Sequence, residues 1–331
     1  MSLDRDSIVF EEGTRTISKS EKIEKVSVAR LSIYSNASLT LLKLFAGLLS
    51  GSVSILSEAI HSAMDLIAAT IAYVSVRISG EPPDMRHAYG HGKYEDISGL
   101  IEALLIIIAA FIIIYEAIQK LFHPHEFESS FLLLGIGVMG ISAVTNIFVS
   151  RRLMKVAKET DSIALEGDAW HLRTDVYTSA GVMAGLIVVY ITGITFLDPL
   201  IAIGVALFIL KAGLSLTKKS YSDLIDCSLS EEEQKQIEEI ALQYKGEFVN
   251  MHCLRTRRAG PEVFIEFHIA VEANTSVHDA HALLDTIEVA LLRAYPRATV
   301  TIHLEACERD CVTCTAKCED RHFIFANDLQ K

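Results

Sequence analysis

The chain has 331 residues, 50% of them hydrophobic, and a formal net charge of −12 at pH 7. The apolar residues come in stretches of membrane-spanning length, which excludes an ordinary soluble enzyme and indicates a polytopic membrane protein with a soluble remainder. The acidic balance, with no dominant basic patch, argues against nucleic acid as a partner.

The first 30 residues are charged throughout and have no apolar region of their own. They predict a cytosolic N-terminal segment rather than a cleaved signal peptide. A transmembrane domain is expected over residues 31–219. Its six expected spans cover residues 31–49, 53–78, 97–122, 131–153, 169–192 and 196–216. Lysine and arginine concentrate before the first span, in the second and fourth loops and after the last span, so the positive-inside rule predicts that both termini are cytosolic.

Two copies of one short pattern lie inside these apolar stretches. His61 and Asp65 stand four positions apart in the second expected span, and His171 and Asp175 do so in the fifth. Positions i and i+4 share one face of a helix, and ionisable residues inside a membrane are costly and usually functional. Two imidazoles and two carboxylates suit the tetrahedral coordination of zinc. The plainer alternative is a pair of buried polar contacts that hold the helices together.

The same four residues predict coupling to protons. Two carboxylates close together at low dielectric constant repel each other, so a divalent cation or bound protons must neutralise them. Metal and protons compete for the same ligand atoms. A site that takes metal from one side of the membrane and protons from the other is an antiporter. The mixed nitrogen and oxygen donors favour zinc, while cadmium, cobalt and iron(II) stay open.

A second set of metal-ligating side chains lies in the loop after the second expected span. Asp84, His87 and His91 fall within eight residues, and Gly90 and Gly92 allow the backbone to fold around an ion. This spacing predicts a second metal site at the cytosolic surface. A solvated polar loop without a metal is the alternative.

Residues 220–306 have the composition of a soluble domain. We expect helices over residues 231–244 and 277–295, and strands over residues 248–256, 262–272 and 298–305. Ser230 is a suitable N-cap before Glu233. The αββαβ order predicts a small two-layer domain whose helices cover one face of the sheet.

The ordered motifs together resemble the cation diffusion facilitator family. They are Gly51-Ser-Val-Ser-Ile-Leu56, the two His-x-x-x-Asp pairs and His87-Ala-Tyr-Gly-His-Gly-Lys93, and the resemblance runs from about residue 30 to residue 305. It implies an α-helical polytopic membrane protein, with six transmembrane helices plus a C-terminal cytosolic αββαβ metallochaperone-like domain, working as a homodimer. Such proteins export divalent transition metals, mostly zinc, from the cytosol in exchange for protons.

The resemblance also assigns roles to residues. It makes His61, Asp65, His171 and Asp175 the transport site, and Asp84, His87 and His91 the loop site. It further implies a binuclear regulatory site at the dimer interface, formed by His252, His268, His281, His303 and Glu305. Glu305 stands where we would expect an aspartate, so the resemblance leaves its ligand distance open.

The tail, residues 307–331, departs from the core of the family. It holds Cys307, Cys311, Cys314, Cys318 and His322. On one rigid helix the first and last cysteine would lie about 16 Å apart, too far to share an ion. Metal capture or sensing, a redox or iron–sulfur role, and a tail of exposed thiols all stay open.

The sequence therefore predicts a proton-coupled antiporter that exports zinc or a similar divalent metal. We expect a homodimer, surrounded by lipid, in a prokaryotic plasma (inner) membrane. The alternative is a membrane-anchored metal sensor or scaffold without transport. An enzyme is not expected, because a metalloprotease needs an open metal position and the sequence contains no His-Glu-x-x-His motif.

Overall fold

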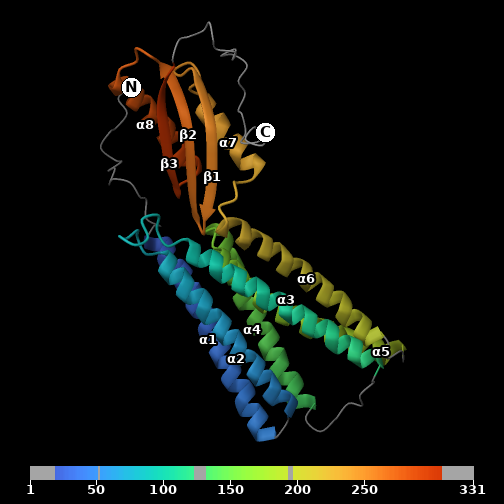
Figure 1. The fold of residues 1–331 in the computed structure, drawn as a ribbon. Coiled ribbons are helices and arrows are strands. Elements are labelled where there is room, and N and C mark those ends of the chain that lie inside the picture. The colour runs from blue at the N-terminus through green and yellow to red at the C-terminus, as the bar shows by residue number, and fades with distance from the viewer. Residues whose placement is uncertain (1–18, 51–52, 123–131, 193–196, 308–331) are drawn as a thin grey trace. The chain divides into compact units, whose positions relative to one another are not determined.

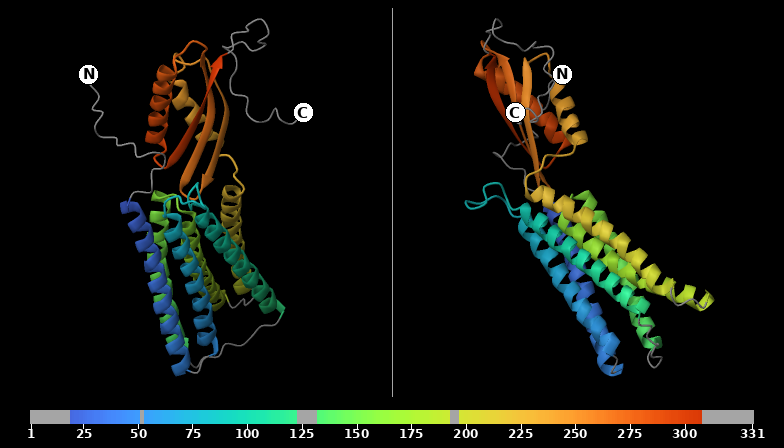
Figure 2. Two further views of the ribbon diagram at one scale, coloured as in Figure 1. Left: turned by 60° about the vertical axis from the view of Figure 1, so that its left-hand side comes forward. Right: turned by 45° about the vertical axis from the view of Figure 1, so that its right-hand side comes forward.

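The computed structural model describes residues 19–50, 53–122, 132–192 and 197–307, and these form two compact units. The helical unit ends at Ile225, and an α+β unit begins at Asp226. Six long helices make up the first unit, side by side in Figures 1 and 2. They are α1 (Lys19–Ser50), α2 (Val53–Ser79), α3 (Lys93–Phe122), α4 (Leu132–Glu159), α5 (Ile163–Thr192) and α6 (Leu197–Leu224).

The helices of the first unit pack mainly as α1 on α2, α3 on α6 and α4 on α5, and α5 also contacts α3, α6 and α2. Small residues allow the close approaches. A Cβ on Gly167 of α5 would lie 2.8 Å from the Cβ of Glu102 on α3, and one on Gly181 would lie 2.8 Å from Val205 Cγ2 on α6. Small residues serve the same purpose in membrane bundles generally. Helix α5 therefore packs against four of the other helices, α2, α3, α4 and α6.

Three stretches within the described residues are long and apolar enough to cross a membrane by length and composition: Ala59–Ser79, Lys93–Gln119 and Pro199–Leu224. They fall in α2, α3 and α6. Large apolar side chains on the outer faces, such as Ile108 and Phe111, are exposed, as expected of residues in contact with lipid. Helix α1 starts twelve residues before the expected first span, and Lys25 is one of its residues.

A buried ionic cluster joins three of these helices. The ammonium of Lys25 on α1 donates to Glu95 on α3, and the hydroxyl of Ser162, which directly precedes α5, donates to the other oxygen of the same carboxylate. The side chains of Lys25 and Glu95 are 2% and 0% exposed. A buried charge without a partner is costly, so this cluster ties the ends of α1, α3 and α5 together.

The second unit has the predicted αββαβ order: α7 (Glu231–Leu242), β1 (Asn250–Ala259), β2 (Glu262–Glu272), α8 (Val277–Ala294) and β3 (Ala298–Cys307) (Figure 1). The sheet order is β1-β2-β3, with β1 antiparallel and β3 parallel to β2. Both helices and the strands share one hydrophobic core, which includes Ile237, Ile265 and Ile287. The capping box predicted at Ser230 and Glu233 is present at the start of α7.

Candidate metal centre

The two His-x-x-x-Asp pairs face each other across the contact between α2 and α5. His171 Nε2 lies 3.0 Å from Asp65 Oδ1, and His61 Nε2 lies 3.7 Å from Asp175 Oδ1. Ligand atoms of His61, Asp65 and Asp175 all lie within 4.8 Å of one another. The two residues of each pair lie one helical turn apart on the same face of their helix. A single contact between α2 and α5 therefore gathers two imidazoles and two carboxylates.

The four side chains differ in their exposure. Asp65 and His171 are 6% and 11% exposed, Asp175 is 21% exposed and His61 is 54% exposed. The site is thus closed on the side of Asp65 and open on the side of His61. Two imidazole nitrogens and two carboxylate oxygens form a donor set that zinc accepts in tetrahedral sites. The geometry can hold a divalent cation.

Two further acids lie beside this site that the sequence reasoning did not single out. Glu102 on α3 is fully buried, and its Oε2 lies 3.8 Å from His171 Nδ1. Neither of its carboxylate oxygens has a hydrogen-bond donor among the described residues. Asp168, one turn before His171 on α5, is also fully buried. Glu102 could have been noticed as a lone acid beside the apolar run that follows it, but nothing local predicts its contact with His171.

The loop residues Asp84, His87 and His91 also come together, with ligand atoms within 4.8 Å of one another. His87 Nδ1 and His91 Nε2 lie 3.3 and 3.4 Å from the two oxygens of Asp84. The backbone N–H groups of His87 and Arg86 each donate to Asp84 Oδ1 at 2.7 Å, and these bonds lower the pKa of Asp84. The carboxylate is therefore held ionised and facing two imidazoles.

The second unit holds a cluster of histidines around Glu305. His268 Nδ1 lies 2.8 Å from Glu305 Oε1, and His252 Nε2 lies 3.2 Å from Glu305 Oε2. His303 Nε2 is 3.9 Å from Glu305 Oε1. The His268 hydrogen bond is the main cause of a lowered pKa of Glu305. The cross-strand pairing of His252 with His268 and of His268 with His303 explains why one side of the sheet gathers these rings.

Not every expected ligand joins a cluster. His281 on α8 is 73% exposed, and its Nε2 lies 3.7 Å from Asp285 rather than near the cluster around Glu305. Its predicted role at a dimer interface stays a prediction. Of the tail residues, Cys307 ends β3, and Cys311, Cys314, Cys318 and His322 lie outside the described residues.

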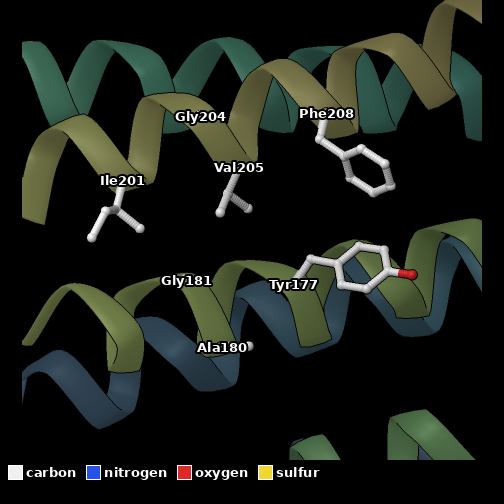
Figure 3. Close-up of a pocket in the computed structure, with 7 residues that line it drawn as sticks. All are labelled: Tyr177, Ala180, Gly181, Ile201, Gly204, Val205 and Phe208. Carbon is white, nitrogen blue, oxygen red and sulfur yellow. The ribbon is translucent and has the colours of Figure 1, made fainter. Parts of the chain in front are cut away.

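An apolar crevice of about 500 Å³ lies between α5 and α6. Figure 3 shows its seven lining residues, with Tyr177 and Phe208 at one end. Their rings meet edge to face at a centroid distance of 5.5 Å. Because no carboxylate, imidazole or thiol is among its lining residues, this crevice offers no ligand to a metal ion.

Comparison with known proteins decides the family. Residues 29–225 match the cation efflux transmembrane domain, and residues 229–307 match the cation efflux protein cytoplasmic domain. The chain belongs to the cation diffusion facilitator family. This transporter is 36% identical over 267 residues to an uncharacterized transporter of Synechocystis, covering 81% of this chain and 86% of the relative. It is 32% identical over 283 residues to the cation-efflux pump FieF of Salmonella choleraesuis, covering 85% of this chain and 93% of that pump.

A solved structure is also similar to part of this cation diffusion facilitator. The zinc form of the transporter CzrB is 41% identical, covers 24% of this chain and 90% of its own, and has a TM-score of 0.23. Membership of the family confirms three of the predictions. The chain is a multi-pass membrane transporter rather than an enzyme, its C-terminal unit is the cytoplasmic dimerisation domain of a homodimer, and its substrate is a metal ion.

Proposed function

We propose that this transporter is a proton-coupled antiporter that exports zinc from the cytosol through a site formed by His61, Asp65, His171 and Asp175. The single observation that supports this most is the meeting of the two His-x-x-x-Asp pairs between α2 and α5, with His171 Nε2 3.0 Å from Asp65 Oδ1. Two imidazoles and two carboxylates form a zinc donor set. A sensor without transport would have no need of such ligands within the apolar helices.

Coupling to protons follows from the burial of the acids. Asp65 and Asp175 cannot both stay ionised and unpaired in this environment, so either a divalent cation or protons must neutralise them. Metal binding requires deprotonated ligands and releases protons. Exchange of one Zn²⁺ against bound protons therefore keeps the site close to neutral in both halves of the cycle. This is the physical basis of antiport.

The remaining site residues complete the proposal. Asp84, His87 and His91 form a loop site that captures metal at the cytosolic surface. His252, His268, His303 and Glu305, with His281, form a regulatory site in the dimerisation domain that responds to cytosolic metal. We place both termini in the cytosol, because lysine and arginine concentrate in the second and fourth loops. We place the protein in a prokaryotic plasma membrane, because the relatives that it matches are bacterial.

The test is zinc flux in proteoliposomes under an imposed pH gradient, with cadmium, cobalt, iron(II) and manganese compared in parallel. Asp175→Asn keeps the size of the side chain but removes its charge, and we expect it to abolish flux. Glu159→Gln, an exposed acid at the end of α4, is the matched control and should transport as the unaltered protein does.

Three outcomes would contradict the proposal. Zinc flux at the unaltered rate in Asp175→Asn would show that Asp175 is not part of the transport site. Zinc flux without any accompanying proton flux would show that zinc export is not coupled to protons. Zinc binding by the intact protein without flux of any metal would favour the alternative, a membrane-anchored metal sensor.

A further inference from the structure

The strand β1 carries a bulge beside the histidine cluster. The register between β1 and β2 is regular up to His252, which pairs with His268, and then shifts before Arg255. Cys253 lies inside this irregularity with φ at 55°, in the left-handed region that non-glycine residues seldom adopt. Such a conformation is strained, and it persists only where the surrounding structure holds it.

The bulge changes the direction in which Cys253 points. Adjacent residues of a regular strand face opposite sides of the sheet, so His252 and Cys253 would be separated. β-Bulges are known to re-aim a side chain. Here Cys253 Sγ and ring nitrogens of His252 and His268 lie within 4.8 Å of one another. A thiol that the strand pattern directs away from the cluster is thus brought into it.

A second observation indicates a ligand at this place. His252 Nδ1 is shielded from solvent and has no hydrogen-bond partner within the described part of the chain. Buried polar nitrogens are nearly always satisfied, so one that is not requires an explanation. The opposite nitrogen, Nε2, already faces Glu305 Oε2 at 3.2 Å. An ion bound by Cys253 would satisfy the free nitrogen.

We propose that Cys253, His252 and His268 form a mixed thiolate–imidazole site for a soft or borderline divalent cation, zinc or cadmium. On binding, the thiol loses its proton to solvent and the thiolate sulfur coordinates the ion. This inference rests on the proposed regulatory role of the cytoplasmic domain and deepens it. The site adjoins the His268, His303 and Glu305 set, with which it shares His268.

The two adjoining sets differ in chemistry. The set of His252, Cys253 and His268 offers two nitrogens and a sulfur. The set of His268, His303 and Glu305 offers two nitrogens and a carboxylate oxygen. Thiolate selects zinc and other soft ions, whereas carboxylate suits harder ions such as manganese. The cytoplasmic domain of this transporter can therefore distinguish cadmium and zinc from harder cations. Cys253 is the residue that supplies the distinction.

The test uses the full-length transporter in detergent with one cysteine retained. In the single-Cys253 protein, serine replaces Cys227, Cys307, Cys311, Cys314 and Cys318. Titration with cadmium should produce a sulfur-to-cadmium charge-transfer band that saturates at one cadmium per protomer. A matched protein that retains only Cys227, which is also exposed and lies in the same unit, should show no band over the same range.

Two further variants separate coordination from folding. His252→Ala in the single-Cys253 protein should weaken cadmium binding at least about tenfold, because it removes a ligand without touching the thiol. Cys253→Gly in the otherwise unaltered protein relieves the left-handed conformation. It should be folded at least as stably as the parent, and at saturating cadmium it should bind one cadmium ion fewer per protomer.

Alkylation provides a second measurement. Zinc should slow the reaction of the single Cys253 with N-ethylmaleimide and leave the single Cys227 protein unaffected, and His252→Ala should abolish that protection. Absence of both the band and the protection, in protein that still transports zinc in proteoliposomes, would overturn this inference and leave the proposed function intact. The effect of Asp175→Asn on zinc flux tests the proposed transport function separately.

Discussion

Glu102 Oε2 lies 3.8 Å from His171 Nδ1, while the opposite nitrogen of the same ring, Nε2, lies 3.0 Å from Asp65 Oδ1. The ring of His171 is thus held between two carboxylates, one from α3 and one from α2. Metal-ligating histidines usually donate their second N–H to a carboxylate, which fixes the tautomer and the orientation of the ring. Glu102 can do this for His171 without touching the ion.

Replacement of Glu102 tests this positioning. Glu102→Gln should raise the zinc concentration needed for half-maximal flux, and lower zinc affinity, by roughly 10- to 100-fold, the usual effect of removing an outer-shell partner. Zinc binding isotherms and proteoliposome flux measure the two quantities. Glu116→Gln, an exposed acid on the same helix, is the control. Equal zinc affinities in the two variants would show that Glu102 does not orient His171.

The contact between α3 and α5 at the same level depends on Gly167. A Cβ at this position would lie 2.8 Å from Glu102 Cβ and 3.1 Å from its Cγ. Gly167→Ala should therefore displace Glu102, cost about 1–3 kcal/mol of stability and reduce zinc affinity in the same direction as Glu102→Gln. Thermal unfolding in detergent and zinc binding measure these effects.

Gly204→Ala is the matched control for this prediction. Gly204 lies on α6 at the apolar crevice of Figure 3, where an added Cβ would meet nothing within 4 Å. Alanine in a helix is favoured over glycine by about 1 kcal/mol. This variant should keep its zinc affinity and be as stable as the unaltered protein or more so. A Gly167→Ala protein that behaves like Gly204→Ala would contradict the close packing.

The buried pair of Lys25 and Glu95 should dominate the stability of the ends of α1, α3 and α5 that it joins. Lys25→Met leaves a buried carboxylate without its cation and should cost about 3–5 kcal/mol. The double variant Lys25→Met/Glu95→Gln should recover most of this loss, and a double-mutant cycle on unfolding free energies measures the coupling. Lys155→Met breaks the exposed 3.7 Å pair with Glu159 and should cost only about 0–1 kcal/mol. Similar costs for the two lysine variants would refute the prediction.

The cytoplasmic domain should lose stability as the pH rises, because of Glu238 on α7. Burial raises the pKa of Glu238, and its Oε1 has no hydrogen-bond donor among the described residues. Below the ordinary glutamate pKa the group is protonated both folded and unfolded, so it carries no penalty. Between the ordinary pKa and the raised pKa, the unfolded group has lost its proton while the folded group still holds it. The stability of the folded domain therefore falls as the pH rises from the first value through the second.

Glu238→Gln should remove this pH dependence and stabilise α7 at neutral pH. Hydrogen–deuterium exchange of peptides from α7 measures it, as the ratio of rates between the variant and the unaltered protein at each pH, so that the intrinsic pH dependence of exchange cancels. Glu239→Gln, the exposed neighbour, should give a ratio near one throughout. A ratio for Glu238→Gln that does not change with pH would exclude this source of instability.

Local patterns accounted for the elements and the candidate ligands of this transporter. The strand expected over residues 262–272 agrees with β2, and the capping residues of α7 were visible at Ser230 and Glu233. These features depend on residues close together in the sequence. The helical spacing of His61 with Asp65, and of His171 with Asp175, likewise placed each pair on one face before any packing was known.

By itself, then, the sequence determined the membrane class, the family, the αββαβ domain and the donor types of each candidate site. Only the tertiary structure decided which distant groups meet. Glu102 reaches His171 because Gly167 admits α3, Lys25 reaches Glu95 across 70 positions, and Cys253 joins His252 because a bulge breaks the alternation of β1. Periodicity describes one helix or strand at a time, whereas these contacts follow from packing between elements and from a local departure from regular geometry.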